Sequence, residues 1–550
     1  MSESLSGIPP KDAVPSFKFD IQNWDTLNAM LRGSLPIPSV YYFASAVTEA
    51  QRDIDDISRT IVALENKRRS VHKRLDAYNS LVSPIRMVPC EILRRIFSLI
   101  CEDNSSTIGP NDICIPPLTL SRVCSTWRDI VMDYPALWSN LSVTIPFAPN
   151  AVRSCHGALR IALERSGTHP LNFSVFIHGH QTPDRSTLAL LASSCSRWAT
   201  ATIDDYSGLI LPPDDDFDDD FPIHDHNFKL AIQGKLHLLE KLSLRLGLPN
   251  NINTFSVAPN LRSVEFYESY PRNITLPWNQ IRSFHFYNHR IHDEMSCLSP
   301  FLPMCSKTLD SFSYDTPVDR SASVMHRLVM DVKTVQLGVV TFTALLRKFS
   351  EVTMPRVESL TLVGSEKHWQ ETLDQSHFET LRTKLLISPT SITLRGVIIS
   401  DEACMHLLRF LPSVKEFVYT DEIPLYPPWK PEPDEDQPVR AIRPLPFTDT
   451  FFGKLNASDP HEENILLPQL THLTVSITTK TFTEQVLVDM IKSRYHSQTS
   501  DLESSIARLQ SVTVRVLDDT LDAQPFESLR CFNRVGLKIK IVDKTGCLFD

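Results

Sequence analysis

The stretch LRSVEF, residues 261–266, follows the order apolar, polar, polar, apolar, polar, apolar. Its last four residues alternate between apolar and polar side chains, as the residues of a half-buried β-strand do. The pattern recurs, with Val418 at one polar position as an exception, in LEKLSL at 239, IRSFHF at 281, LDSFSY at 309, VKTVQL at 332, VESLTL at 357, VKEFVY at 414, LTHLTV at 470 and LQSVTV at 509. Several copies follow shortly after a proline, which would end the preceding element. The sequence therefore predicts a series of short strands in an α/β fold.

The spacing of these copies resembles that of leucine-rich repeats, whose periods are about 20–29 residues. The first five intervals are 22, 20, 28, 23 and 25 residues, whereas the later intervals of 57, 56 and 39 residues are irregular. The resemblance implies a degenerate leucine-rich-repeat-like solenoid over residues 139–550, with insertions near 212–226 and 424–446. A less regular α/β domain is the alternative.

In such a solenoid, strand alternation places one set of side chains on the concave face. The set is small and polar, and it comprises Lys241, Ser243, Ser263, Glu265, Ser283, His285, Ser311, Ser313, Thr334, Gln336, Ser359 and Thr361. Glu265 and His285 interrupt the otherwise uniform row, and they are the candidate contacts for a protein target. The alternative is that these residues are only the solvated side of the sheet.

Two helical segments precede the strands. In VPCEILRRIF, residues 88–97, the bulky apolar side chains fall on one helical stripe, and Arg94 and Arg95 face elsewhere. A second segment of helical spacing is LSRVCSTWRDIV at 120–131, and PALW follows at 135–138. Two short helices cannot bury both stripes against each other, so we expect some apolar surface to bind another molecule.

The ordered pieces VP, EIL, IF, VCSTWR and PALW resemble the F-box family pattern. The resemblance implies a small all-α module over residues 83–138 that binds the adaptor subunit of an SCF-type ubiquitin ligase and, through it, the cullin. The residues that would line or support this surface are Pro89, Ile92, Leu93, Ile96, Phe97, Val123, Cys124 and Trp127, with Trp127 expected in the core. An ordinary helical hairpin is the alternative.

The connection at 101–117 is longer and more polar than that of most F-boxes. Its composition predicts a solvent-exposed loop, and long surface loops cost little stability. The sequence leaves open whether this insert weakens adaptor binding.

The N-terminal region divides into two parts. Residues 1–38 contain several prolines and few regular apolar positions, so we expect a flexible arm. Residues 39–82 carry a heptad pattern that begins at Val47 and is interrupted at Arg68, and this pattern predicts one long amphipathic helix. The stripe either packs on the protein's own body or forms a coiled coil with a second copy. We favour the first interpretation, in which the chain is monomeric outside the complex.

Composition excludes several classes of function. With 55 basic and 65 acidic residues among 550, the net charge is −10, which disfavours nucleic acid as a partner. No apolar run approaches the length of a membrane span and no signal peptide is evident, so we expect a soluble cytoplasmic or nuclear protein. The acidic stretch 212–226 lacks the ligand alternation and the glycine of a calcium loop, and the cysteines form no CxxC pair. We therefore expect no metal and no cofactor.

The sequence also lacks the common phosphate-binding, nucleophile-elbow and zinc-protease motifs. The resulting expectation is a non-catalytic substrate receptor, with the F-box binding the adaptor and the solenoid binding a target. A coiled-coil and leucine-rich-repeat scaffold unrelated to ubiquitin is the alternative, and an enzyme with an unrecognised site is a third.

Overall fold

The computed structural model describes residues 25, 28–29, 31–34, 40–146, 149–177, 184–205, 226–246, 251–287, 298–315, 327–339, 349, 351–364, 388–397, 399–421, 446–457, 465–496 and 506–549. These residues belong to two compact units, Met1–Cys90 and Glu91–Asp550. Most of the expected arm at 1–38 lies outside the described residues, as do nearly all of the expected insertions at 212–226 and 424–446.

The first unit consists mainly of one helix. Helix α2 spans Val40–Leu81, and a short 3₁₀ helix, η1, follows at Pro84–Met87. The prediction of one long helix over the heptad segment is confirmed. Its heptad side chains, from Val47 to Tyr78, are mostly exposed.

The second unit begins with a helix, two short strands and two further helices, and it continues with alternating strands and helices. The helices of this unit in the described ranges are α3 (Cys90–Asp103), α4 (Pro116–Leu120), α5 (Ser125–Met132), α6 (Pro149–Arg165), α7 (Arg185–Ser193), α8 (His226–Ile232), α10 (Leu302–Cys305), α13 (Asp401–Arg409), α14 (Asp449–Leu455), α15 (Glu484–His496) and α16 (Arg530–Arg534). In the same unit, PALW forms the 3₁₀ helix η2, Pro135–Trp138.

A single sheet of 17 strands runs through the second unit. Its strands are β1 (Ser106–Ile108), β2 (Ile113–Cys114), β3 (Asn140–Thr144), β4 (Leu171–Phe176), β5 (Trp198–Asp205), β6 (Lys241–Leu246), β7 (Ser263–Tyr267), β8 (Ser283–Tyr287), β9 (Ser311–Asp315), β11 (Thr334–Val339), β13 (Ser359–Gly364), β14 (Ser391–Arg395), β15 (Glu416–Thr420), β16 (His472–Ile477), β17 (Ser511–Val516), β18 (Lys538–Asp543) and β19 (Gly546–Phe549). Strands β10 (Leu328–Val329) and β12 (Val352–Thr353) form a separate parallel pair.

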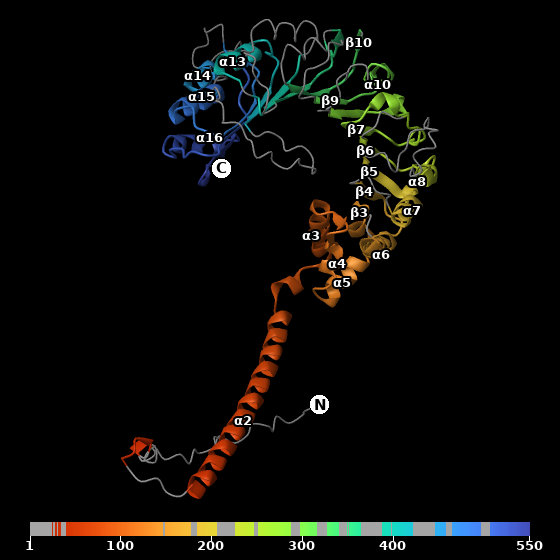
Figure 1. Ribbon diagram of the computed structural model, residues 1–550. Coiled ribbons are helices and arrows are strands. Elements are labelled where there is room, and N and C mark those ends of the chain that lie inside the picture. The colour runs from red at the N-terminus through yellow and green to blue at the C-terminus, as the bar shows by residue number, and fades with distance from the viewer. Residues whose placement is uncertain are drawn as a thin grey trace. The chain divides into compact units, whose positions relative to one another are not determined.

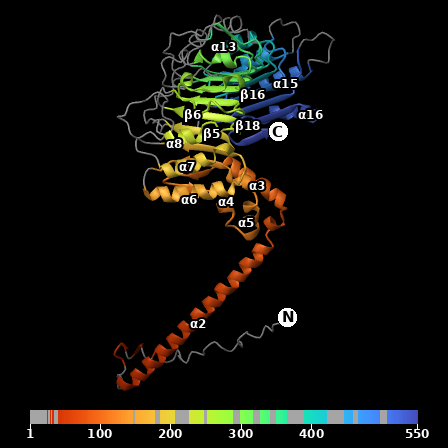
Figure 2. The ribbon, with the colours of Figure 1, turned by 90° about the vertical axis from the view of Figure 1, so that its right-hand side faces the viewer.

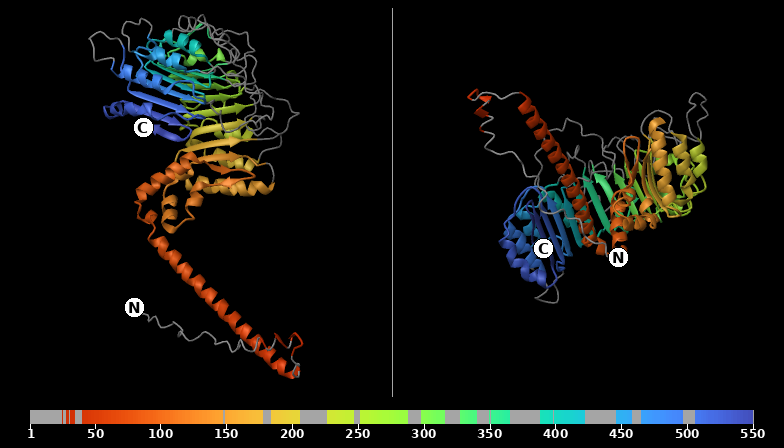
Figure 3. Two further views of the ribbon diagram at one scale, coloured as in Figure 1. Left: turned by 90° about the vertical axis from the view of Figure 1, so that its left-hand side faces the viewer. Right: turned by 90° about the horizontal axis from the view of Figure 1, so that it is seen from below.

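From β3 to β18 the strands pair in parallel and in sequence order. Antiparallel strands β2 and β19 lie near the two ends, so the sheet is open and is not a closed barrel. Within this unit the sheet curves, and the helices from α6 to α16 lie along its convex side (Figure 1). Figures 2 and 3 show the strands side by side in this order.

Alternation along each strand explains why the sheet forms. In β7, Val264 and Phe266 are buried, whereas Ser263 and Glu265 are only half-buried. The buried positions of successive strands pack into one continuous apolar core between the sheet and the helices. The other positions face the concave side, because neighbouring side chains on a strand point to opposite faces.

All nine predicted strand segments are strands in the structure, each beginning two residues after the first position of its pattern. The interval of 57 residues between the copies at 357 and 414 also contains β14. There Pro389 occupies the first apolar position of the pattern, which interrupts the sequence signal.

The expectation of a solvent-exposed loop at 101–117 is wrong in part, because residues 102–104 and 110–114 are exposed but the segment also contains strands β1 and β2. Strand β1 pairs in parallel with β3, and Ser106 and Ile108 are buried. Asn140 at the start of β3 donates through Nδ2 to the carbonyl oxygen of Cys101 at 3.4 Å. Strand β1 has only three residues, and two of them, Ser106 and Thr107, are polar, so the sequence pattern does not predict it. The insert attaches α3 to the first strands of the sheet.

In the described ranges we find no helix that combines the length and hydropathy needed to cross a bilayer.

Candidate functional site

Helix α3 has two distinct apolar faces. Leu93 and Phe97 are buried in the core, with 3% and 0% of their surfaces exposed. Four other aliphatic residues, at spacings i, i+4, i+7 and i+8, are instead exposed: Ile92, Ile96, Leu99 and Ile100. The single stripe predicted from the sequence therefore divides into a face that holds the helix in place and a face that remains open to a partner.

The segment around α5 packs beside this helix. The Trp127 ring is half-buried, and its centroid lies 4.7 Å from that of Phe97 in an edge-to-face arrangement. Cys124 is the N-cap of α5, where its Sγ accepts from the backbone N–H of Trp127 at 3.5 Å. Val123 is exposed. Cys124 thus caps α5, Trp127 packs against Phe97, and Val123 is accessible to a partner.

The eight predicted adaptor contacts fall into three groups. Leu93 and Phe97 are core residues, and Cys124 and Trp127 support the junction between the helices. Pro89, Ile92, Ile96 and Val123 are exposed. Leu99 and Ile100 were not among the predicted contacts, although the i+7 and i+8 spacing from Ile92 indicates them.

A second candidate surface lies on the concave face of the sheet. The cross-strand register confirms that the twelve predicted polar residues share this face. Six of the twelve lie in register with one another and with one residue on each of six further strands, and we term this line the central polar row, although Val418 in it is apolar. The row comprises Ser174, Thr202, Ser243, Glu265, His285, Ser313, Gln336, Thr361, Thr393, Val418, Thr474 and Thr513.

Glu265 is the centre of a polar cluster in this row. Its Oε1 lies 2.7 Å from Nζ of Lys241, and its Oε2 accepts from Ser243 Oγ at 2.6 Å and from the Tyr267 hydroxyl at 3.3 Å. Burial by itself would raise the pKa of Glu265, but the hydrogen bonds from Lys241 and Ser243 outweigh it and hold that pKa below its usual value. Glu265 is therefore an ionised acceptor at neutral pH.

His285 lies on the next strand, directly opposite Glu265. Its ring centroid is 5.8 Å from that of Tyr267, and its Nε2 is buried without a hydrogen-bond partner among the described residues. Burial lowers the pKa of His285, although the charge of Glu265 opposes this shift. Ser313 follows on the other side, and its buried Oγ likewise has no partner in the described ranges. Because buried polar groups are normally hydrogen-bonded, these two atoms distinguish His285 and Ser313 from the other residues of the row.

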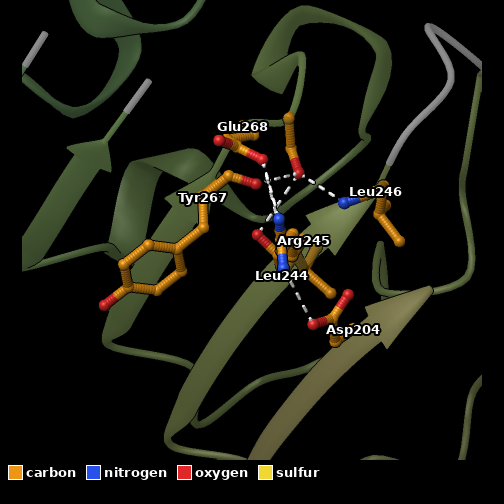
Figure 4. A network of polar contacts seen from close by, with 7 residues as sticks. Asp204, Leu244, Arg245, Leu246, Tyr267 and Glu268 are labelled. Carbon is orange, nitrogen blue, oxygen red and sulfur yellow. Dashed lines mark hydrogen bonds and ion pairs between the residues drawn. The ribbon is translucent and has the colours of Figure 1, made fainter. Parts of the chain in front are cut away.

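A separate network of polar side chains joins the ends of three neighbouring strands (Figure 4). Arg245 lies between two carboxylates, with Nη1 at 3.3 Å from Asp204 and Nη2 at 3.0 Å from Glu268. Ser269 accepts from the N–H of Leu246 at 2.6 Å. This network could not be predicted from the sequence, because the partners of Arg245 are 23 and 41 residues away from it along the chain. Because its charged groups pair with one another, the network is a structural cross-link between strands.

Among the described residues, no group of three or more histidine, cysteine, aspartate or glutamate side chains is placed to hold a metal ion. The acidic stretch at 212–226 falls outside that part of the chain except for the backbone of its last residue. What the two surfaces offer is an apolar helix face and a row of hydrogen-bonding groups, which are features of protein binding.

No protein-family model matches this chain, and a search of curated proteins found no significant match.

Proposed function

We propose that this protein is the substrate-recognition subunit of an SCF-type ubiquitin ligase. The observation that carries the proposal is the exposed aliphatic face of α3, because Ile92, Ile96, Leu99 and Ile100 remain uncovered in a helix whose other apolar residues are buried. Contiguous apolar surface of this kind is a feature of interaction sites. The F-box-like order of residues names the adaptor as the partner.

The sheet would be a degenerate leucine-rich-repeat-like solenoid that holds the target. In support, nearly every strand pairs in parallel with the next along the chain, and the concave face carries the central polar row. Glu265 and His285 would make the specific contacts, since the first is ionised and the second has a ring nitrogen without a hydrogen-bond partner in the described part of the chain. The chain would supply positioning, which raises the effective concentration of target lysines near a ubiquitin carrier on another subunit.

A scaffold without a link to ubiquitin is the second candidate, and the exposed heptad stripe of α2 favours it. Binding of the adaptor distinguishes the two functions, because a scaffold without a link to ubiquitin would not bind it.

The decisive experiment replaces Ile92 and Ile96 by aspartate in the full chain. Both side chains are exposed, so the fold should survive, but two carboxylates would be buried unpaired at the interface. We expect adaptor co-purification from a matching cell extract to fall by more than about thirtyfold, the effect of removing an interface hot spot. Leu93→Asp is unsuitable because Leu93 belongs to the core.

Leu230→Asp is the matched control, since Leu230 is an exposed aliphatic residue on α8, away from α3. It should leave adaptor capture unchanged. Failure of the wild-type protein to capture the adaptor would overturn the proposal in favour of the scaffold.

A further inference from the structure

Helix α2 presents an apolar stripe that nothing in its own unit covers among the described residues. With Val47 at position a, the a positions are Val47, Ile54, Ile61, Arg68 and Leu75, and the d positions are Ala50, Ile57, Leu64, Val71 and Tyr78. The large apolar members other than Ile57 are 46–67% exposed. A stripe of aliphatic residues at this spacing is the seam of a coiled coil.

We propose that α2 pairs with α2 of a second copy of the chain in an antiparallel two-stranded coiled coil. This differs from the intramolecular packing that the sequence analysis favoured. The pairing does not depend on the proposed ubiquitin-ligase function.

The charge distribution along α2 favours the antiparallel orientation. From Glu49 to Arg59 the helix carries two basic and four acidic residues, a net charge of −2, whereas from Glu65 to Asp76 it carries five basic and two acidic residues, a net charge of +3. Antiparallel pairing places the acidic half of each helix beside the basic half of the other. Parallel pairing would place like beside like, and complementary charge selects register and orientation.

The interruption at Arg68 gives an independent argument. In a parallel, in-register pair the two Arg68 side chains would meet at the same a position, and their charges would repel each other within the seam. In an antiparallel pair with Ile61 opposite Leu64 of the second copy, each Arg68 lies opposite Ile57 instead. Its aliphatic stem can then cover the seam while the guanidinium reaches solvent.

The flanking positions agree with this register. Asp53 and Arg74 are both g positions, and g positions face each other across an antiparallel pair. When the antiparallel pair is centred between Ile61 and Leu64, Asp53 of each copy lies opposite Arg74 of the other. The dimer therefore contains two such pairs. A parallel pair would instead set Asp53 against Ser58 and Arg74 against Asn79, without an opposite-charge pair.

The consequence would be a bivalent molecule. The 42 residues of α2 span about 63 Å at 1.5 Å per residue, and the C-terminal ends of two antiparallel helices lie at opposite ends of the pair. Two copies of the second unit would thus be joined through a spacer, and two linked binding modules raise the avidity for a repeated partner.

The existence of the dimer is tested with Ile61→Asp/Leu64→Asp in the full chain. We expect the wild type to sediment as a dimer at micromolar concentration and this variant to sediment as a monomer, because four carboxylates would enter the central seam. Val62→Asp/Asn66→Asp is the matched control, since both residues lie on the same turns but outside the seam, and it should remain dimeric. A monomeric wild type, or a dimer that survives the seam variant, would overturn the proposal.

The orientation is tested by charge exchange. Asp53→Arg and Arg74→Asp should each raise the dimer Kd by about tenfold, because two attractive pairs become repulsive. An equimolar mixture of the two variants should restore the wild-type Kd as a heterodimer, since both facing pairs then regain opposite charges. Asp55→Arg with Lys73→Asp, at outer positions, serves as the control and should leave the Kd unchanged. If the single variants do not raise the dimer Kd, or if mixing them does not restore it, the antiparallel register is wrong.

Discussion

Two pairs of glutamate and histidine face the same side of the sheet, one in each half of the second unit. Glu265 on β7 lies opposite His285 on β8, and Glu416 on β15 lies opposite His472 on β16. The first pair occupies the middle of its strands and the second pair occupies their first residues. The residue types and the parallel register are the same, so the pairs differ in their position along the strands and in their surroundings.

Those surroundings are unlike in burial and in hydrogen bonding. Glu265 has a lysine, a serine and a tyrosine as partners, and His285 has a buried ring nitrogen without one in the described ranges. Glu416 is exposed and accepts only from Ser391 Oγ at 2.9 Å among the hydrogen bonds of the described residues, while His472 Nδ1 is 2.8 Å from the hydroxyl of its neighbour Thr471. Burial and hydrogen bonding, rather than residue type, therefore distinguish Glu265 and His285 as candidate contacts from Glu416 and His472.

The largest expected difference between the pairs is in target binding. Glu265→Arg/His285→Glu should weaken target capture by at least about tenfold, roughly 1.4 kcal/mol, while adaptor binding is unaffected. Glu416→Arg/His472→Glu makes the same exchange in the other half and should leave capture within about twofold of wild type. Quantitative mass spectrometry of co-purified proteins measures both. Equal partner profiles for all three proteins would remove the concave face of β7 and β8 from consideration.

Much of the sheet was predictable because each strand needs only three apolar positions in a fixed order. LRSVEF and its copies indicated nine strands, and the structure confirms them. Strand β3 carries the same pattern, as WSNLSV at 138–143, but this copy lies far ahead of the regularly spaced ones and was not identified. Strands such as β14, with a proline at the first apolar position, give no such signal.

The site was predictable only in part. Alternation along β7 and β8 correctly placed Glu265 and His285 on one face, and the same rule would have placed Tyr267 beside them. Burial of individual atoms was not predictable, because it depends on neighbours contributed by other strands. The division of α3 into a buried face with Leu93 and Phe97 and an open face with Ile92 and Ile96 likewise depends on what packs against the helix.

A smaller difference is expected in stability. Glu265→Gln removes the charge that holds Lys241 and weakens the hydrogen bonds from Ser243 and Tyr267, so we expect it to lower the free energy of unfolding by about 1 kcal/mol. Glu416→Gln should have an effect below about 0.5 kcal/mol, since its carboxylate is exposed. Urea denaturation at pH 7 measures both. The comparison would fail if the two glutamines proved equally destabilising.

The smallest expected effect is on the pH dependence of stability, and it concerns His285. Burial lowers its pKa in the folded state, so below the ordinary value of about 6.5 the unfolded chain binds more protons than the folded one. The contribution of neutral His285 to the stability of the fold is therefore fully present above about pH 6.5, and it is lost as the pH falls through the folded-state pKa. Glu265 contributes in a different range, because its lowered pKa affects stability only below the ordinary glutamate value of about 4.3.

Urea unfolding between pH 7 and pH 5 therefore separates the effect of His285 from that of Glu265. We expect His285→Phe to lose less stability than wild type over this range, because the variant has no ring nitrogen to protonate at that position. Lys241, Glu265 and Tyr267 are the charged or titratable groups around the ring, and all three are retained in the variant. Ser313→Ala is the control, since it removes the neighbouring buried hydroxyl without removing a titratable group, and it should keep the wild-type dependence. If His285→Phe and wild type lose the same stability between pH 7 and pH 5, His285 is not held neutral by burial, and its distinction from His472 as a candidate contact disappears.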